Sequence, residues 1–270
     1  MKAKAVIEVV VVFSLTLLLV ALVGLSPIGE WERQVTNQFF IEYAIIIAVP
    51  LLLLLVTRRN LAAYGLSLRN PGYHLNIAAT AFVPVVFGIL PAAFVDYKSW
   101  SGALIIAIVQ IAVLFAVGWL LKRKPTMNES GLLVGAIFLI SRFNLTQQAT
   151  LGNSISAFVS YLFFLGFGEE LLFRGYIQSR LNAAWGRPFQ FFGVNWGWGI
   201  VIMALLFGLM HFLNIGSLVL GNWQLEPWWG FWTFFGGLVL GLVREKTGSI
   251  AASTILHGLP DAMYHAFLGT

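Results

Sequence analysis

The sequence contains no cysteine and few charged residues. The lack of cysteine among 270 residues excludes disulfides, thiolate metal ligands and cysteine nucleophiles. Charged residues make up 10% of the chain, whereas a soluble domain carries about 25%. Hydrophobic residues make up 59%, and apolar runs of about 20 residues, long enough to cross a bilayer, recur along the whole length. The composition therefore indicates a polytopic helical membrane protein.

The charge that is present is mostly basic. The formal net charge is +5 and the pI is about 9.6. No basic helix interleaved with aromatic residues occurs, so we expect no nucleic acid partner and attribute the excess to basic loops at a membrane surface. The first apolar run follows Lys2 and Lys4 and lacks a small-x-small cleavage site. We interpret it as a retained helix that contacts the lipid bilayer.

Nine apolar segments are predicted as helices. They cover about residues 5–25, 39–56, 77–95, 103–121, 131–144, 154–185, 196–213, 228–243 and 249–268. The apolar part of the fifth segment is only about half a span long. The predicted fold is therefore all-α, a transmembrane bundle of eight or nine spans with a polar intramembrane cavity. We expect one transmembrane domain over residues 1–270, with N-terminal helices in 1–153 and a second group of helices in 154–268, which carries the polar motifs described below.

The distribution of lysine and arginine predicts the orientation in the membrane. A cytoplasmic N-terminus and nine spans leave only Arg33, Lys98 and Arg142 outside, with Arg174 inside the membrane. Basic residues concentrate on the cytoplasmic side of membrane proteins, so we expect an integral protein of the cell (plasma) membrane with its N-terminus in the cytoplasm. Tryptophans near the predicted helix ends are typical of an interfacial belt; they are Trp31, Trp100, Trp196, Trp198, Trp223, Trp228 and Trp229.

The segment Gly-Glu-Glu-Leu-Leu-Phe-Arg at 168–174 places three charges in an apolar helix. Charge is costly in hydrocarbon, so such a segment is a candidate functional site. Glu170 and Arg174 are four residues apart, the better order for an ion pair on one helix face. Glu169 is rotated by about 100° and is less naturally paired. We therefore predict a structural Glu170–Arg174 pair and a free Glu169. An ion pair that only fixes helix register is the alternative.

Two histidines in later apolar helices supply possible partners. His211 follows Phe207 by one turn, and His257 precedes Asp261 by one turn. His74, in a connector, and His265, near the C-terminus, are given no role. A carboxylate and a histidine can activate a water molecule, while a second histidine can donate to an oxyanion. A zinc site of two histidines and a carboxylate uses the same atoms, although no His-Glu-x-x-His helix and no Gly-x-Ser-x-Gly elbow is present.

The three motifs Glu-Glu-x-x-x-Arg at 169–174, Phe-x-x-x-His at 207–211 and His-x-x-x-Asp at 257–261 resemble the signature of the CPBP (Abi/CAAX) family of intramembrane glutamic proteases, which includes the Ras-converting-type CAAX prenyl endopeptidases. The resemblance covers residues 154–261. It implies a helical membrane bundle in which Glu169 and His211 activate the water, Glu170 and Arg174 hold the site together, and His257 and position 261 form the oxyanion hole. It implies no cofactor and no metal.

One position departs from the prenyl endopeptidases, which have asparagine where this chain has Asp261. An ionised aspartate cannot donate to an oxyanion, so we expect Asp261 to orient His257 or to be neutral. The resemblance implies an endopeptidase that cleaves a membrane-associated peptide or lipidated protein, in the CAAX case beside a prenylated cysteine. The alternatives are a non-catalytic immunity or scaffold protein of the same fold and a zinc-dependent membrane hydrolase.

Overall fold

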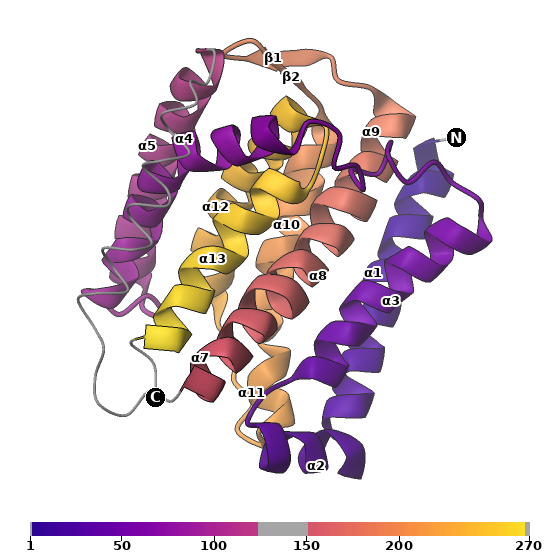
Figure 1. The fold of residues 1–270 in the computed structure, drawn as a ribbon, viewed down its shortest axis with the longest axis vertical. Coiled ribbons are helices and arrows are strands. Elements are labelled where there is room, and N and C mark those ends of the chain that lie inside the picture. Colours follow the sequence, from indigo (N-terminus) through magenta and orange to yellow (C-terminus); the bar gives the residue numbers. More distant parts are fainter. Residues whose placement is uncertain (1, 124–150, 268–270) are drawn as a thin grey trace.

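The computed structural model describes residues 2–123 and 151–267, which form a bundle of long helices (Figure 1). The N-terminal half contains α1 (Lys2–Gly24), α2 (Pro27–Thr36), α3 (Phe40–Val56), α4 (Pro71–Ile89), the 3₁₀ turn η1 (Leu90–Ala93) and α5 (Trp100–Lys122). The C-terminal half contains α7 (Leu151–Phe158), η2 (Val159–Phe167), α8 (Gly168–Glu170), η3 (Leu171–Gln178), α9 (Ser179–Trp185), β1 (Phe189–Phe191), β2 (Val194–Trp196), α10 (Trp198–Leu213), α11 (Ile215–Val219), α12 (Pro227–Thr247) and α13 (Ala251–Phe267).

Five helices of the described residues are long and apolar enough to cross a membrane: Lys2–Gly24, Pro71–Ala93, Trp100–Lys122, Ile155–Trp185 and Trp198–Val219. The apolar helix Phe40–Val56 is shorter. An integral membrane protein with a helical bundle is thus confirmed. The predicted number of eight or nine spans is not, and the predicted helix at 131–144 lies outside the described residues.

The helix that carries the Glu-Glu motif has two wide segments. Both η2 and η3 are π-helical, and the three residues of α8 lie between them. Hydrogen bonds in a π-helix join residues five apart, and such turns are frequent at functional sites. Neither segment was predicted, because the apolar pattern of the sequence does not distinguish α-helical from π-helical turns.

One helix was not predicted, and two further predictions about local structure were wrong. The polar stretch after α1 forms α2, which Ser26 caps through its contact with the Gly29 amide and which Pro27 starts as an N1 proline does. Helix α4 begins six residues earlier than predicted, at Pro71, so His74 is buried in a helix and does not lie in a connector.

An antiparallel β-hairpin interrupts the all-α pattern between α9 and α10. Phe189 pairs with Trp196, and their rings lie 4.8 Å apart. Phe192 and Gly193 both have positive φ, as a two-residue hairpin turn of the primed type requires. The predicted helix start at residue 196 was wrong because this residue ends β2.

Two buried apolar clusters hold the bundle together. The first is built mainly by α4, α5, α12 and α13, and the second mainly by α1, α3, η3 and α10. The helix α13 therefore belongs to one cluster and the Glu-Glu helix to the other, so the site lies where the clusters meet. In Figure 1 the N-terminus, α9 and the β-hairpin gather at the upper end of the bundle, α2 and α11 lie at the lower end, and α8 lies between these ends.

Candidate active site

The two adjacent glutamates of α8 have different surroundings. Glu170 and Arg174 are both fully buried, and Arg174 Nη1 lies 2.9 Å from Glu170 Oε1. Glu169 is also buried, but its Oε2 makes no hydrogen bond among the described residues. The predicted ion pair between Glu170 and Arg174 is therefore present, and Glu169 is the carboxylate left without such a partner.

His257 of α13 faces both glutamates. Its Nδ1 lies 3.0 Å from Glu170 Oε1, at hydrogen-bond distance, and its Nε2 lies 3.6 Å from Glu169 Oε2. An ionised carboxylate accepts only, so Nδ1 carries the proton donated to Glu170. Glu170 therefore contacts both Arg174 and His257. It joins the helix that carries the Glu-Glu motif (η2, α8 and η3, called the motif helix below) to α13.

Two glycines allow α13 to come this close. A Cβ atom on Gly166 would lie 2.7 Å from Gly258 Cα, and a Cβ on Gly258 would lie 2.9 Å from Leu162 Cα. Small residues permit such close backbone packing between membrane helices. Because Gly258 directly follows His257, the contact fixes the histidine against the glutamates.

His211 of α10 approaches the site from another side. Its Nδ1 lies 2.8 Å from the carbonyl oxygen of Phe207. A carbonyl can only accept, so Nδ1 donates, and in the neutral ring Nε2 keeps its lone pair. His211 is thereby prepared to accept a proton or a hydrogen bond at Nε2.

The ring of Phe207 lies at the centre of these groups. The guanidinium carbon of Arg174 is 4.4 Å from the ring centroid, within the range of a cation–π contact. The rings of His211 and His257 are 4.5 Å and 5.7 Å away. Phe207, predicted as a supporting residue, thus contacts His211, His257 and Arg174.

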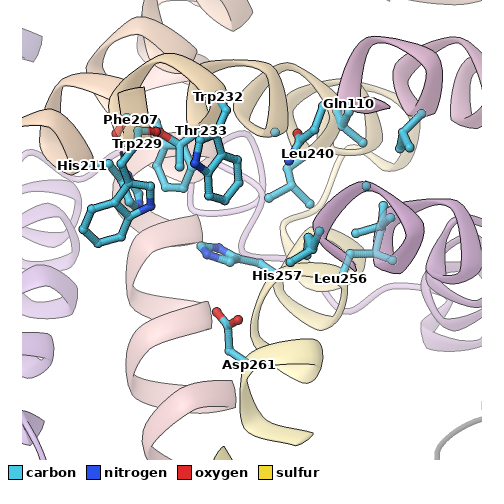
Figure 2. A pocket seen from close by; sticks show the side chains of 16 residues that line it. Gln110, Phe207, His211, Trp229, Trp232, Thr233, Leu240, Leu256, His257 and Asp261 are labelled. Carbon is cyan, nitrogen blue, oxygen red and sulfur yellow. Dashed lines mark hydrogen bonds between the residues drawn. The ribbon is translucent and has the colours of Figure 1, made fainter. Parts of the chain in front are cut away.

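Two cavities adjoin the site. The first, about 210 Å³, is lined by His211, His257 and Asp261 together with aromatic and apolar residues of α4, α5 and α12 (Figure 2). The second, about 240 Å³, is lined by Glu169, His211 and residues of α1, α3, α10 and α11. Since a water molecule occupies about 30 Å³, either cavity has room for a peptide side chain. His211 and Trp229 line both cavities, so they lie at the boundary between them.

Trp229, which was predicted for the interfacial belt, lies beside His211 and lines both cavities. Its ring centroid lies 5.0 Å from that of His211. Trp31, Trp100, Trp198, Trp223 and Trp228 are exposed, as belt residues should be. The sequence did not separate Trp229 from its exposed neighbour Trp228, because the two positions are adjacent at a helix start.

Asp261 lies one helical turn from His257 on the wall of the first cavity, and Figure 2 shows its carboxylate on the same side as the His257 ring. The two ring nitrogens of His257 face Glu169 and Glu170, and whether Asp261 orients His257 or is neutral stays a prediction. The structure thus brings Glu169, Glu170, Arg174, Phe207, His211, His257 and Asp261 together around two cavities.

Residues outside the motifs also reach the site. Tyr43 of α3 lines the second cavity, and Gln110 of α5 lines the first. A buried glutamine in an apolar helix was a signal that the sequence contained. Tyr43 belongs to no motif and could not have been singled out. Among the described residues, no three His, Asp or Glu side chains are grouped to hold a metal ion.

Residues 151–263 match the family model described as type II CAAX prenyl endopeptidase Rce1-like. No curated protein and no solved structure matches the chain. The matched segment runs from α7 to α13 and contains the three motifs together with the residues that surround Phe207. At residues 151–263 the chain therefore carries an Rce1-like domain of the CPBP family, which is a family of membrane proteases.

Proposed function

We propose that this protein is a membrane-embedded endopeptidase that uses Glu169 and His211 to activate a water molecule. One observation carries the proposal: the two adjacent glutamates differ, and only Glu169 is free for chemistry. Glu170 is bonded to Arg174 and His257, whereas Glu169 lines a cavity together with His211. The His211 tautomer supports the same assignment, since its Nε2 lone pair is available to a water molecule.

In the proposed reaction, water attacks the scissile carbonyl carbon while Glu169 takes one of its protons. His211 Nε2 accepts a hydrogen bond from the same water and orients it. The tetrahedral intermediate then collapses as the C–N bond breaks, and Glu169 passes the proton to the leaving nitrogen. The products are a carboxylic acid and an amine, which exchange a proton to give the carboxylate and the ammonium, with no covalent enzyme intermediate. His257, Asp261 or another donor would stabilise the oxyanion.

The proposed substrate is a peptide of a membrane-associated, lipidated protein. The first cavity supports this class because its wall is mostly apolar and aromatic, with Phe207, Trp229 and Trp232 beside Val85 and Leu240. An isoprenoid chain on a cysteine would bury apolar surface against such a wall. We further propose that residues 1–270 form one membrane domain of the plasma membrane. Its N-terminus would be cytoplasmic, because the end with the N-terminus and the hairpin carries Lys2, Lys4, Arg180 and Arg187.

The test is cleavage by the purified protein in lipid vesicles. A peptide with a prenylated cysteine fourth from its C-terminus is incubated in H₂¹⁸O and analysed by mass spectrometry. We expect loss of the C-terminal tripeptide and one ¹⁸O atom in the new carboxylate, with slower cleavage of the unprenylated peptide. No cleavage of either peptide would contradict the proposal and favour a non-catalytic immunity or scaffold protein.

The same assay distinguishes the proposed reaction from that of a zinc-dependent hydrolase. A chelator that strips zinc should leave the cleavage rate unchanged, and elemental analysis of the active preparation should find no stoichiometric zinc. Loss of activity with the chelator and its return with zinc would assign the reaction to a metal-activated water.

A further inference from the structure

The proposed hydrolysis needs a hydrogen-bond donor for the oxyanion, and the expected donors do not supply one clearly. His257 presents its nitrogens to Glu170 and Glu169. His211 Nδ1 bonds the Phe207 carbonyl, so its Nε2 is an acceptor when the ring is neutral. Asp261, when ionised, has no proton to donate. The donor must therefore come from another residue on the cavity wall.

Tyr43 is placed to be that donor. It lines the second cavity together with Glu169 and His211. Glu42, one residue before it on α3, lines the same cavity. The Tyr43 side chain thus shares a cavity wall with the proposed base Glu169 and with His211 of α10.

Packing fixes the position of Tyr43 beside Glu169. A Cβ atom on Gly168 would lie 3.6 Å from the Tyr43 carbonyl oxygen and 3.2 Å from Ile47, so α3 contacts the motif helix one residue before Glu169. The rings of Phe40 and Phe164, 5.0 Å apart, hold the start of α3 against η2. A donor on a rigidly packed helix is preorganised, which is what oxyanion stabilisation requires.

We propose that the Tyr43 hydroxyl is a catalytic donor that stabilises the oxyanion of the tetrahedral intermediate. This inference rests on the proposed endopeptidase function. The phenol keeps its proton throughout: as the carbonyl π electrons move onto oxygen, the O–H···O⁻ hydrogen bond shortens and strengthens. Tyr43 lies outside the matched segment 151–263, so the N-terminal helices would contribute directly to catalysis.

Two tryptophans on the cavity walls are the competing donors. Trp232 lines the first cavity, and the second cavity, which holds Glu169, is lined by other residues. Trp229 lines both cavities, and its replacement by phenylalanine is therefore a comparison arm of the test.

The first test is Tyr43→Phe, which removes only the hydroxyl. In the vesicle cleavage assay we expect kcat to fall about 10²-fold, the usual effect of losing one oxyanion donor, while KM stays within about twofold. Tyr73→Phe is the matched control, because its hydroxyl donates to the Lys246 carbonyl at the end of α12 and should leave kcat unchanged. A rise of KM at unchanged kcat in Tyr43→Phe overturns the proposal. A decrease of kcat in Trp229→Phe but not in Tyr43→Phe overturns it as well.

The second test uses Asp261→Asn, which adds an amide donor on the wall of the first cavity, on the other side of His211 and Trp229 from Tyr43. We expect this variant alone to remain active and the Tyr43→Phe penalty to shrink to about tenfold in its background. An equal penalty in both backgrounds would show that the Tyr43 hydroxyl and position 261 do not serve one oxyanion. If the wild-type protein cleaves no peptide, the proposed function fails and this inference with it; equal rates of wild type and Tyr43→Phe overturn this inference alone.

Discussion

The motif helix takes part in two clusters of arginine and glutamate, and they differ in how well their polar atoms are bonded. The buried cluster consists of Glu169, Glu170, Arg174 and His257. The terminal cluster consists of Glu8, Arg59, Tyr176 and Arg180. In the terminal cluster the Glu8 carboxylate forms ion pairs with Arg59 at 2.6 Å and Arg180 at 3.0 Å and accepts a hydrogen bond from Tyr176 at 2.5 Å. Each oxygen of Glu8 is thus bonded, and the cluster ties α1 to η3 and α9.

The buried cluster is less completely bonded. Glu169 Oε2, Glu170 Oε2 and Arg174 Nε have no hydrogen-bond partner among the described residues, although all three atoms are buried. Buried polar groups without partners are rare and call for an explanation such as a catalytic role. The comparison teaches that charge in a membrane helix is not by itself a sign of catalysis. Incomplete bonding beside a cavity separates the proposed functional cluster from the terminal one.

The largest predicted effect is on His211, which has no counterpart in the terminal cluster. His211→Ala should lower kcat by about 10²- to 10⁴-fold, because it removes the acceptor that orients the attacking water. The vesicle cleavage assay measures this, with His265→Phe as the control, since phenylalanine preserves the stack on Tyr161. Wild-type kcat in His211→Ala would remove this histidine from the mechanism.

The next effect is on stability in the buried cluster. Arg174→Met leaves Glu170 as a buried carboxylate without its guanidinium, which should cost about 3–5 kcal/mol. Thermal unfolding in detergent should show a large decrease in the unfolding temperature. An unfolding temperature equal to that of wild type would mean that the pair is not the structural clamp described above.

The terminal cluster should tolerate change better. Glu8→Gln weakens the charge-assisted bonds to Arg59 and Arg180, which are worth about 1.5–3 kcal/mol, and these side chains remain partly exposed. We expect lower thermal stability with an unchanged kcat for the folded fraction. A loss of kcat in this variant at full folding would erase the distinction between the two clusters.

Close packing beside His257 gives a further prediction. Gly258→Ala places a Cβ atom 2.8 Å from the Tyr161 carbonyl, which should cost about 1–3 kcal/mol and displace His257 from the glutamates. Gly72→Ala is the control, because a Cβ there meets nothing within 4 Å. Cleavage and unfolding temperature should both fall in the first variant only. Equal behaviour of the two variants would contradict the role given to this helix contact.

The smallest effect concerns an ion pair at the outer edge of the site. Lys98 Nζ lies 2.9 Å from Glu226 Oε1, and this hydrogen bond raises the pKa of Lys98 above its ordinary value. A raised lysine pKa stabilises the folded state below the ordinary value of about 10.4, and this contribution is lost as pH rises through the folded-state pKa. Lys98→Met should therefore cost less than about 1 kcal/mol near neutral pH and nothing at high pH. A deficit that persists at high pH would contradict this origin.

Much of the fold followed from the sequence because long apolar runs must be helices in a bilayer. The helices that carry Glu169, His211 and His257 were predicted on that ground, and spacing of four residues predicted the Glu170–Arg174 contact. The sequence did not predict that Glu170, and not Asp261, bonds His257. That contact depends on the approach of α13 through Gly166 and Gly258, a tertiary property that spacing along one helix does not contain.

The missed elements have local causes. Helix α2 and the earlier start of α4 depend on Ser26, Pro27 and Pro71, whose capping and N1 signals lie in polar segments that hydropathy treats as loops. The hairpin depends on two adjacent residues with positive φ. Tyr43 could not be found at all, because nothing in an apolar helix indicates which tyrosine will face a carboxylate from a distant segment.

The most direct test of the central claim compares Glu169→Gln with Glu170→Gln, two adjacent isosteric changes. Thermal unfolding and the cleavage rate per folded molecule are measured for each in the same vesicles. We expect Glu169→Gln to unfold like wild type but to cleave at least about 10²-fold more slowly, and Glu170→Gln to be strongly destabilised. A Glu169→Gln protein that is folded and cleaves at the wild-type rate would contradict the assignment of Glu169 as the base.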